Sequence, residues 1–427
     1  MSNDPFSSLP EEMLEEISKF FQRGDVVTEP HKSYSALAQT CKTLRPYFQR
    51  RLFTNVDLTA EIRIRTFAKL VQVNPILASY VQTILLPANH MYMGLFQYPP
   101  LLTIMHAVNT ASYSGTLPEI HLCIEHQYVL TDQNLPPNIF TYILYAPQNI
   151  LDAITKLTAG QSAAAFPVGL FRLLPNLRQL CGYHLILSSI IDYNPSAEYR
   201  TPEYFRPKLN KLSLGGIYTT TIRMLSEQIL DLSTVKDLEI FSIKSESTSG
   251  AYPNSKNFLA QRLLDRAQSV EKLHLDIGVM VGSFYDLGQL QRLRECTLDI
   301  DVEVGKNPVP HLCQLLRTLP PLPEHDLEYL CLSIQLTDNL LDENNVADSQ
   351  LLFSINTWSK FDTALVDVVS SGTRPFKLML AFYIGTQSFY SVQPLLKDLF
   401  VNWGRNFLPR SSQQQNLNIH IFHLSSF

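Results

Sequence analysis

The chain has 427 residues, of which 45% are hydrophobic and 17% are charged, and its formal net charge is -5. This length allows several domains or one elongated array, with ample apolar material for a core. The acidic balance argues against nucleic acid or an anionic membrane as a partner, because both need clustered Lys and Arg.

Cysteine usage and the first residues bear on the compartment. The six cysteines are scattered without a C-x-x-C pair, which argues against a disulfide scaffold or a zinc site. The N-terminus is acidic and lacks the apolar core of a signal peptide. Residues 70–118 contain no Asp, Glu, Lys or Arg, but Pro75, Pro87, Pro99 and Pro100 interrupt them, so a membrane span is not expected. These features predict a cytoplasmic or nuclear protein.

The stretch LPEEMLEEI, residues 9–17, predicts the first helix. Pro10 suits the first helical position, where its missing N–H is harmless. The two glutamates after it favour the positive end of the helix dipole. Apolar residues then recur at three- and four-residue spacing as one stripe: Met13, Leu14 and Ile17.

Two further helices are expected before residue 53. Leu37, Cys41 and Leu44 lie on one face of a second helix, which should stop near Arg45 because a proline follows. Residues 47–52 then suit a third, short helix. The three make a unit of roughly fifty residues, close to the lower size limit for a domain that folds alone.

A six-residue template, apolar-x-x-apolar-x-apolar, recurs through the rest of the chain. Its last two apolar residues alternate across a polar one, as in a strand with one buried face. Copies begin at Phe53, Val81, Leu117, Leu209, Val235, Val270, Leu293 and Leu327, with weaker copies at Leu177, Pro375 and Asn416.

Amphipathic stretches between the templates predict helices at residues 221–232, 257–268, 311–319 and 392–403. Strand followed by helix, repeated, is typical of a leucine-rich-repeat-like solenoid. From residue 209 to 327 the steps are 26, 35, 23 and 34 residues, and the Asn or Cys of the regular repeat is missing. The sequence therefore predicts an α/β fold, either an irregular solenoid or a parallel sheet with crossover helices.

Candidate chemistry is sparse. The chain contains no P-loop, G-x-G-x-x-G, G-x-S-x-G or H-E-x-x-H motif, so no catalytic residue, metal or cofactor is predicted. Asp299, Asp301 and Glu303 alternate along one expected strand and should face the same side. An acid/base or ion site is one reading, but a solvated, substrate-facing surface is favoured, and Asp276 joins it as a candidate for binding a basic substrate.

The N-terminal residues resemble an F-box. The first half of the family pattern is filled by Leu9, Pro10, Glu12, Met13, Leu14 and Ile17, the middle by Leu37, Thr40, Cys41, Lys42, Leu44 and Arg45, and the end by Leu52 and Phe53. The loop at residues 22–33 is longer than in most members. The remainder is similar to fungal F-box proteins with irregular leucine-rich repeats.

The resemblance implies an F-box at residues 1–53 and a substrate-recognition region at residues 54–427. An F-box docks on a Skp-type adaptor of a cullin–RING ubiquitin ligase, while the repeats hold a protein substrate without doing chemistry. The adaptor-binding residues would be Leu9, Pro10, Glu12, Met13, Leu14, Ile17, Leu37, Cys41, Leu44, Leu52 and Phe53. A scaffold outside any ligase is the alternative; a hydrolase or transferase is disfavoured, since no nucleophile motif is present.

Overall fold

A computed structural model of the chain divides into two compact units, each treated by itself below. Unit 1 comprises Met1–Ala159, Gly169–Leu177 and Asp192–Glu203, and unit 2 comprises Gly160–Val168, Arg178–Ile191 and Tyr204–Phe427. The structure describes residues 13–15, 35–36, 38–39, 45–87, 98–112, 117–125, 146–160, 166–185, 187–188, 206–241, 255–276, 285–302, 309–319, 326–336, 355–369, 375–384, 407–414 and 417–425.

The N-terminal part of unit 1 is helical wherever it is described before residue 55. Residues 13–15, 35–36 and 38–39 are helical, and α3 spans Arg45–Thr54, which contains the predicted third helix. Ala38 and Phe48 form a small buried cluster, and Leu14, Tyr47 and Leu52 pack against it. The predicted domain boundary after residue 53 falls at the end of α3 and stays a prediction.

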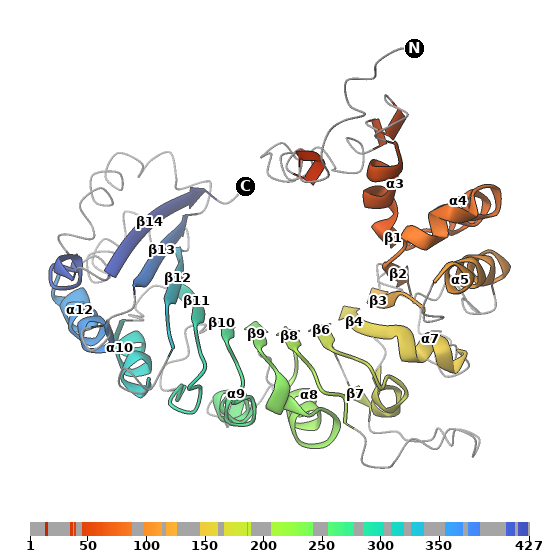
Figure 1. Cartoon of the computed structure of the whole chain (residues 1–427). Helices are drawn as coiled ribbons and strands as arrows, with labels where there is room; N and C mark the ends of the chain where they lie inside the picture. Colours follow the sequence, from red (N-terminus) through yellow and green to blue (C-terminus); the bar gives the residue numbers. More distant parts are fainter. Residues whose placement is uncertain are drawn as a thin grey trace. The chain divides into compact units, whose positions relative to one another are not determined.

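The remainder of unit 1 alternates strands with helices. Its strands are parallel neighbours in the order β1-β2-β3-β4, with Val56 beside Ile84 and Ile84 beside Ile120. Figure 1 shows α4, α5 and α7 on one side of these strands. The elements are β1 (Asn55–Asp57), α4 (Glu61–Val73), η1 (Pro75–Tyr80), β2 (Thr83–Pro87), α5 (Pro99–Ala111), β3 (Glu119–Glu125), α7 (Gln148–Ala153) and β4 (Ile154–Gly160). The 3-10 helix η4 (Val168–Leu173) follows, and all of it except Val168 belongs to unit 1.

Unit 2 is built on a parallel sheet in the order β6-β8-β9-β10-β11-β12-β13-β14, and β5 and β7 form a separate parallel pair. The strands are β5 (Phe166–Pro167), β6 (Gln179–Tyr183), β7 (Leu187–Ser188), β8 (Lys211–Gly215), β9 (Asp237–Phe241), β10 (Lys272–Asp276), β11 (Glu295–Val302), β12 (Tyr329–Leu336), β13 (Phe376–Ile384) and β14 (Leu417–Ser425). The α/β class and the parallel sheet are therefore confirmed.

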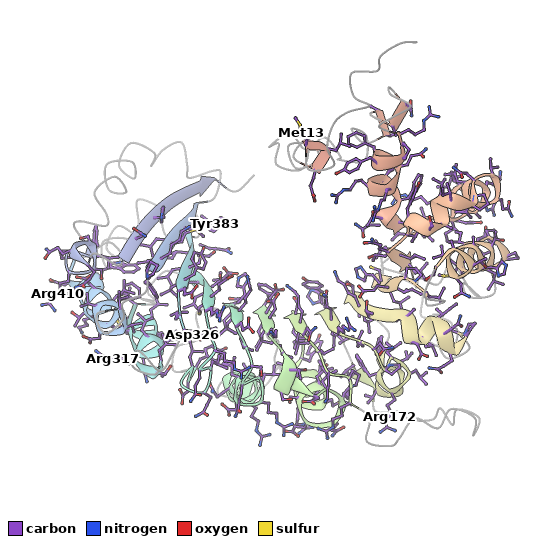
Figure 2. All side chains as sticks on the ribbon, viewed as in Figure 1. Met13, Arg172, Arg317, Asp326, Tyr383 and Arg410 are labelled. Atoms are coloured by element: carbon purple, nitrogen blue, oxygen red, sulfur yellow. The ribbon has the colours of Figure 1, made fainter. Side chains whose placement is uncertain are left out.

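The helices of unit 2 lie along one face of its sheet. They are α8 (Thr219–Met224), which continues as the π-helix η5 (Leu225–Ile229), then η6 (Leu232–Thr234), α9 (Ser255–Arg266), α10 (Val309–Thr318), α12 (Ile355–Val369) and η9 (Ser411–Gln413). In Figure 1, no helix of the described residues lies on the opposite face of β8–β12. That face is called the open face below. Figure 2 shows Tyr383 of β13 on the strand side and Arg317 of α10 on the helix side.

Each of the eleven template copies contains a strand, so this prediction is confirmed. In the β8 copy, Leu209, Leu212 and Leu214 at positions one, four and six are fully buried. The same three positions are buried in the copies of β9, β10, β11 and β12. Burial of one face explains why the pattern found these strands. The seven-residue strand β4 and the short β5 and β7 were not predicted.

The strand repeats of unit 2 are joined by a recurring backbone contact. The carbonyl of the second template residue accepts N–H groups from the second and third residues of the next copy. Each distance runs from a backbone nitrogen to the shared carbonyl oxygen. Arg178 accepts from Asn210 and Lys211 at 2.7 and 3.1 Å, and Asn210 accepts from Lys236 and Asp237 at 2.8 and 3.1 Å. The next three copies repeat this contact: Glu271 and Lys272 donate to Lys236 at 2.8 and 2.9 Å, Arg294 and Glu295 to Glu271 at 2.8 and 3.0 Å, and Glu328 and Tyr329 to Arg294 at 2.9 and 3.0 Å.

The predicted helices have mixed outcomes. Those at 257–268 and 311–319 coincide closely with α9 and α10, whereas the one at 221–232 is broken into α8, η5 and η6. The one at 392–403 lies outside the described residues. Within the described part of residues 70–118, α4 ends and η1, β2 and α5 follow. Among described helices, none combines the length and apolar content that crossing a membrane requires.

Candidate functional site

Two of the four predicted substrate-binding residues meet on the open face. Asp276 at the end of β10 is the register partner of Asp299 on β11. Asp301 lies two residues further along β11, in register with Gln335. The side chain of Asp301 and the whole of Glu303 lie outside the described residues.

A histidine that the sequence did not single out, His274, is bound to Asp299 of this pair. His274 Nε2 lies 2.7 Å from Asp299 Oδ2, across the β10–β11 boundary. The ring of His274 also meets Phe241 edge-on, with 4.6 Å between ring centroids. His274 and Asp276 are two residues apart on one strand and so share a face, a signal that the sequence did contain.

A second aromatic side chain extends the same surface across β8. Tyr183 on β6, Gly215 on β8 and Phe241 on β9 occupy one register row. A Cβ atom at Gly215 would lie 2.7 Å from the Tyr183 ring, so only glycine lets this ring lie over the strand. Tyr183 keeps 43% of its surface exposed. Together these side chains form an aromatic–acidic row: Tyr183, Phe241, His274, Asp276 and Asp299.

Aromatic faces beside carboxylates suit a cationic side chain. The negative face of an aromatic ring attracts Lys or Arg, and a carboxylate forms charge-assisted hydrogen bonds with the same groups. The aromatic–acidic row offers both on neighbouring strands. Its composition therefore fits the lysine or arginine side chains of a protein ligand.

Cross-strand ion pairs lie next to the aromatic–acidic row on the open face. Lys211 Nζ on β8 lies 2.8 Å from Asp237 and 2.5 Å from Glu239 on β9. Burial lowers the pKa of Lys211, but its hydrogen bonds to these two carboxylates outweigh burial and raise the pKa overall. Lys272 on β10 likewise pairs with Glu295 on β11 at 2.7 Å.

The cysteines of the unit 2 core are poor nucleophiles. Burial raises the pKa of Cys296 to about 12, and burial also raises the pKa values of Cys313 and Cys331. A thiol needs a lowered pKa to react as thiolate at neutral pH. Within the described ranges, no three His, Cys, Asp or Glu side chains are grouped so that they could hold a metal ion.

Four of the predicted adaptor-binding residues are described. Met13 is 52% exposed, whereas its neighbour Leu14 packs against the cluster of Ala38 and Phe48. Leu52 and Phe53 are half-buried at the end of α3. Figure 2 shows Met13 on its short helical segment. The remaining seven, Leu9, Pro10, Glu12, Ile17, Leu37, Cys41 and Leu44, lie outside the described residues.

An ion pair ties the first of these segments to α3. Arg51 of α3 donates to Glu15 at 3.0 Å and lies with its guanidinium carbon 5.7 Å from the Tyr47 ring centroid. The apolar cluster and this ion pair bring together segments that the sequence predicted as three helices.

No protein-family model matches the chain, and no curated protein matches its sequence. The F-box resemblance therefore rests on the residues quoted for it.

Proposed function

We propose that the chain is the substrate-recognition subunit of a Skp–cullin–F-box ubiquitin ligase, with residues 1–53 docking a Skp-type adaptor. The repeat region would hold a protein substrate beside the ligase and raise its effective concentration there. The observation that carries this proposal is the ordered F-box-like residue set, from Leu9 to Phe53, directly before the strand repeats.

The described N-terminal residues support the docking role. Leu14 is directed to the cluster of Ala38 and Phe48, while adjacent Met13 stays 52% exposed. A small helical unit with exposed apolar side chains can bury them against a partner. Each side chain that becomes fully buried stabilises the complex by about 1.5–3 kcal/mol.

The contacts of unit 2 support an irregular leucine-rich-repeat-like solenoid. Every copy from β8 to β12 buries the same three template positions and repeats the same shared carbonyl contact. Helices lie on one face and leave the other to side chains from successive strands. Such repeats present extended surfaces for protein binding.

The aromatic–acidic row points to a basic segment as the substrate feature. Asp276 and Asp299 supply negative charge, and Tyr183 and Phe241 supply aromatic surface next to it. We expect a lysine- or arginine-containing stretch of the substrate to lie across β6 to β11.

Adaptor binding tests the proposal directly. A purified Skp-type adaptor should bind the full chain, and the L9A/P10A variant should lose at least about 100-fold in affinity. The S7A/S8A variant changes the same segment without touching the motif and should bind as the wild type does. Tryptophan fluorescence of unit 2 should be the same in all three proteins. Unchanged binding by L9A/P10A contradicts the F-box assignment.

Substrate capture tests the second half. In cells with the ligase blocked, the wild-type chain should accumulate a substrate that the D299K/D301K variant does not retain. An unchanged set of captured proteins would exclude the acidic surface as the reader. Capture of the same proteins without any adaptor binding would favour the scaffold function instead.

A further inference from the structure

Helix α4 carries apolar residues on two sides, but only one side is buried in unit 1. Its buried stripe is Ile64, Phe67, Ala68 and Val71. Ile62, Leu70 and Val73 lie on its other side and are 69%, 40% and 86% exposed. A surface helix ordinarily has one apolar stripe facing the core and polar residues opposite.

Exposed apolar side chains concentrate around this helix. Among the described residues, seven large hydrophobic side chains are exposed, and four of them fall within residues 62–76: Ile62, Leu70, Val73 and Ile76. Single exposed apolar residues are normal, but a contiguous group of them marks an interaction surface.

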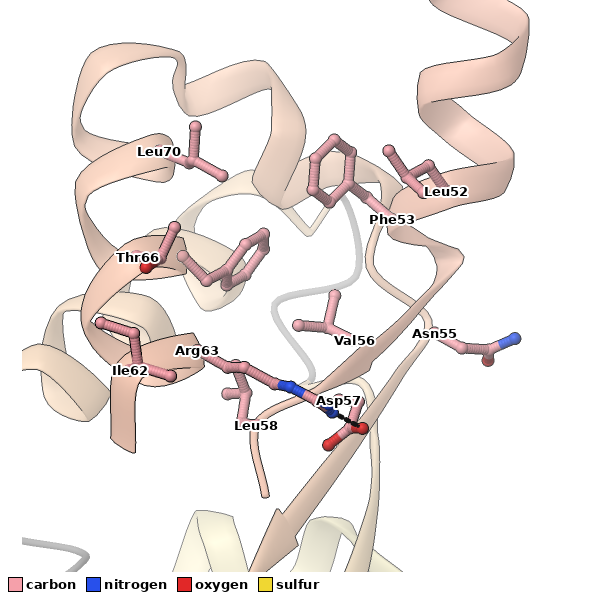
Figure 3. Close-up of a pocket in the computed structure, with 11 residues that line it drawn as sticks. Leu52, Phe53, Asn55, Val56, Asp57, Leu58, Ile62, Arg63, Thr66 and Leu70 are labelled. Atoms are coloured by element: carbon pink, nitrogen blue, oxygen red, sulfur yellow. Dashed lines mark hydrogen bonds and ion pairs between the residues drawn. The ribbon is translucent and has the colours of Figure 1, made fainter. Parts of the chain in front are cut away.

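The exposed side of α4 forms one wall of a groove. Figure 3 shows Ile62, Thr66 and Leu70 along α4, with Leu52 and Phe53 at the end of α3. The groove has a volume of about 630 Å³, within the range of ligand-binding sites. Phe53 and Phe67 stack at 5.8 Å between centroids and line it, so the groove is bordered by aromatic surface.

The chain around the groove is basic, in contrast to the acidic protein as a whole. Residues 45–76 contain six Arg or Lys and only two Asp or Glu, whereas the net charge of the protein is -5. Both acidic residues pair with basic residues of the same stretch, Asp57 with Arg63 and Glu61 with Arg65, which leaves an excess of four basic residues there. Arg63 and its partner Asp57 both line the groove, and Lys69 precedes Leu70 on α4.

One contact beside the groove shows how another segment of this chain covers α3. Segment 13–15 lies against α3, with Glu15 paired to Arg51 and Leu14 packed against the cluster of Ala38 and Phe48. Apolar anchoring next to a carboxylate–arginine pair is therefore the mode in which α3 is covered.

We infer that the α3–α4 groove docks an acidic, amphipathic helix of a partner protein. Its apolar residues fill the space between Phe53 and Leu70, and its carboxylates face the surrounding Arg and Lys. This is the helix-in-groove mode of recognition, in which apolar anchors give affinity and charge gives orientation and selectivity. The inference does not depend on the F-box assignment, although Leu52 and Phe53 belong to both surfaces.

A designed peptide tests this on the full chain. The probe is a fluorescent helical peptide of about 18 residues with Leu at i, i+3, i+4 and i+7 and Glu at the other positions; its twin carries Lys in place of Glu. The acidic peptide should bind at least about tenfold tighter than the basic one. Its affinity should fall between about 50 and 300 mM salt, because counterions screen the surrounding charges.

Variants locate the binding surface. I62D/L70D should weaken the acidic peptide at least about tenfold, since it places negative charge in the apolar groove. L102D is the matched control, because Leu102 on α5 is 42% exposed but does not line the groove. Since Ile62 and Leu70 are exposed, I62D/L70D should melt within about 3 °C of the wild type.

Three results would overturn the inference. Equal binding of the two peptides by the wild type would remove the charge argument, and unchanged binding by I62D/L70D would place the peptide elsewhere. No peptide binding, together with a melting temperature lowered by more than about 5 °C in I62D/L70D, would mean that this chain itself covers the groove. The L9A/P10A variant should bind the peptide normally, so failure of the adaptor proposal and failure of the groove are distinguishable.

Discussion

Helices α4 and α10 show two different relations between apolar content and burial. In α10 the apolar residues Val309, Leu312, Cys313, Leu315 and Leu316 are all buried, and Gln314 and Arg317 are exposed. In α4 the four buried residues account for only one side, and Ile62, Leu70 and Val73 remain exposed. Helix α10 of unit 2 therefore buries these apolar side chains within the fold, whereas helix α4 of unit 1 leaves apolar side chains exposed that a partner can bury.

Charges follow the same division. On the open face of unit 2, Lys211 and Lys272 are matched by carboxylates on the neighbouring strand. Around α4, Arg63 and Arg65 are also paired, but basic residues still outnumber acidic ones three to one within residues 45–76. An excess of basic residues next to exposed apolar surface has the composition expected of an interface centre and its surroundings. The predictions below test this difference, from the largest expected effect to the smallest.

Truncating one leucine in each helix gives the sharpest contrast. L312A removes a side chain that is 2% exposed and should cost about 2–5 kcal/mol, because it leaves a cavity beneath α10. L70A removes one that is 40% exposed and should cost less than about 0.5 kcal/mol. Urea unfolding followed by tryptophan fluorescence measures L312A, since Trp358 is buried in unit 2. Hydrogen exchange of the α4 amides measures the stability cost of L70A. Equal costs for L312A and L70A would show that the two helices do not differ in burial as described.

A buried and an exposed aspartate extend the contrast to polar groups. Asp362 of α12 is 1% exposed and accepts N–H groups of Arg410 and Ser411 at 2.9 and 2.8 Å. D362N should cost about 2 kcal/mol, because charge-assisted bonds inside the core are lost. D57N in unit 1 breaks an exposed pair with Arg63 and should cost less than about 1 kcal/mol. Urea midpoints for D362N and hydrogen exchange for D57N check these values.

His121 tests whether unit 1 has an ordinary interior beneath its exposed helix surface. Burial, followed by the nearby charge of Lys156, lowers the pKa of His121 to about 4, and its Nε2 lies 2.8 Å from Thr158 Oγ1. Between pH 6.5 and 4 the unfolded chain binds more protons than the folded one, so stability is full above pH 6.5 and falls as pH drops through this window.

The expected loss is about 1 kcal/mol, since water still screens the half-buried ring. Hydrogen exchange of the β3 and β4 amides at pH 7 and pH 5, corrected for intrinsic rates, measures it. H121Q should flatten the dependence. A wild-type profile that is already flat would mean that β3 and β4 are open to water as α4 is.

Lys211 gives the smallest effect and tests the matching of charges. K211M leaves Asp237 and Glu239 without their shared cation and should cost about 0.5–1 kcal/mol at low salt, with less cost at 1 M salt. K236M is the milder control, because Lys236 is 61% exposed in its pair with Glu271. Urea midpoints at two salt concentrations provide the measurement, and a salt-independent cost would show that packing, not charge, is lost.

The strands of both units could be predicted from the sequence because one buried face imposes a fixed template. The strand β4 was missed because Ala159 stands at the last template position, where the strong copies carry Leu or Ile, although Ile154 and Leu157 keep the first and fourth positions. Helix α4 was also missed, because EIRIR at its start alternates as a strand would and its apolar residues fall on two sides. The break in helix 221–232 depends on a π-turn that no periodicity predicts.

The candidate site was predictable only in part. Alternation marked Asp299 as a surface residue, but its closeness to Asp276 and His274 depends on the register of two strands that are separated by a long connection. The position of Tyr183 over Gly215 depends on register in the same way. Residue types and faces follow from the sequence, whereas neighbours across strands follow only from the fold.

The shared carbonyl contact has a consequence for how this chain can change over evolution. The step from Val235 to Val270 is 35 residues and the step from Val270 to Leu293 is 23 residues, yet both end in the same pair of hydrogen bonds. Because those bonds involve only main-chain atoms, insertions and deletions between strands leave the stacking of the next strand intact. Descendants of one ancestral array can therefore acquire new loops, and with them new ligands, while the framework that carries them stays the same.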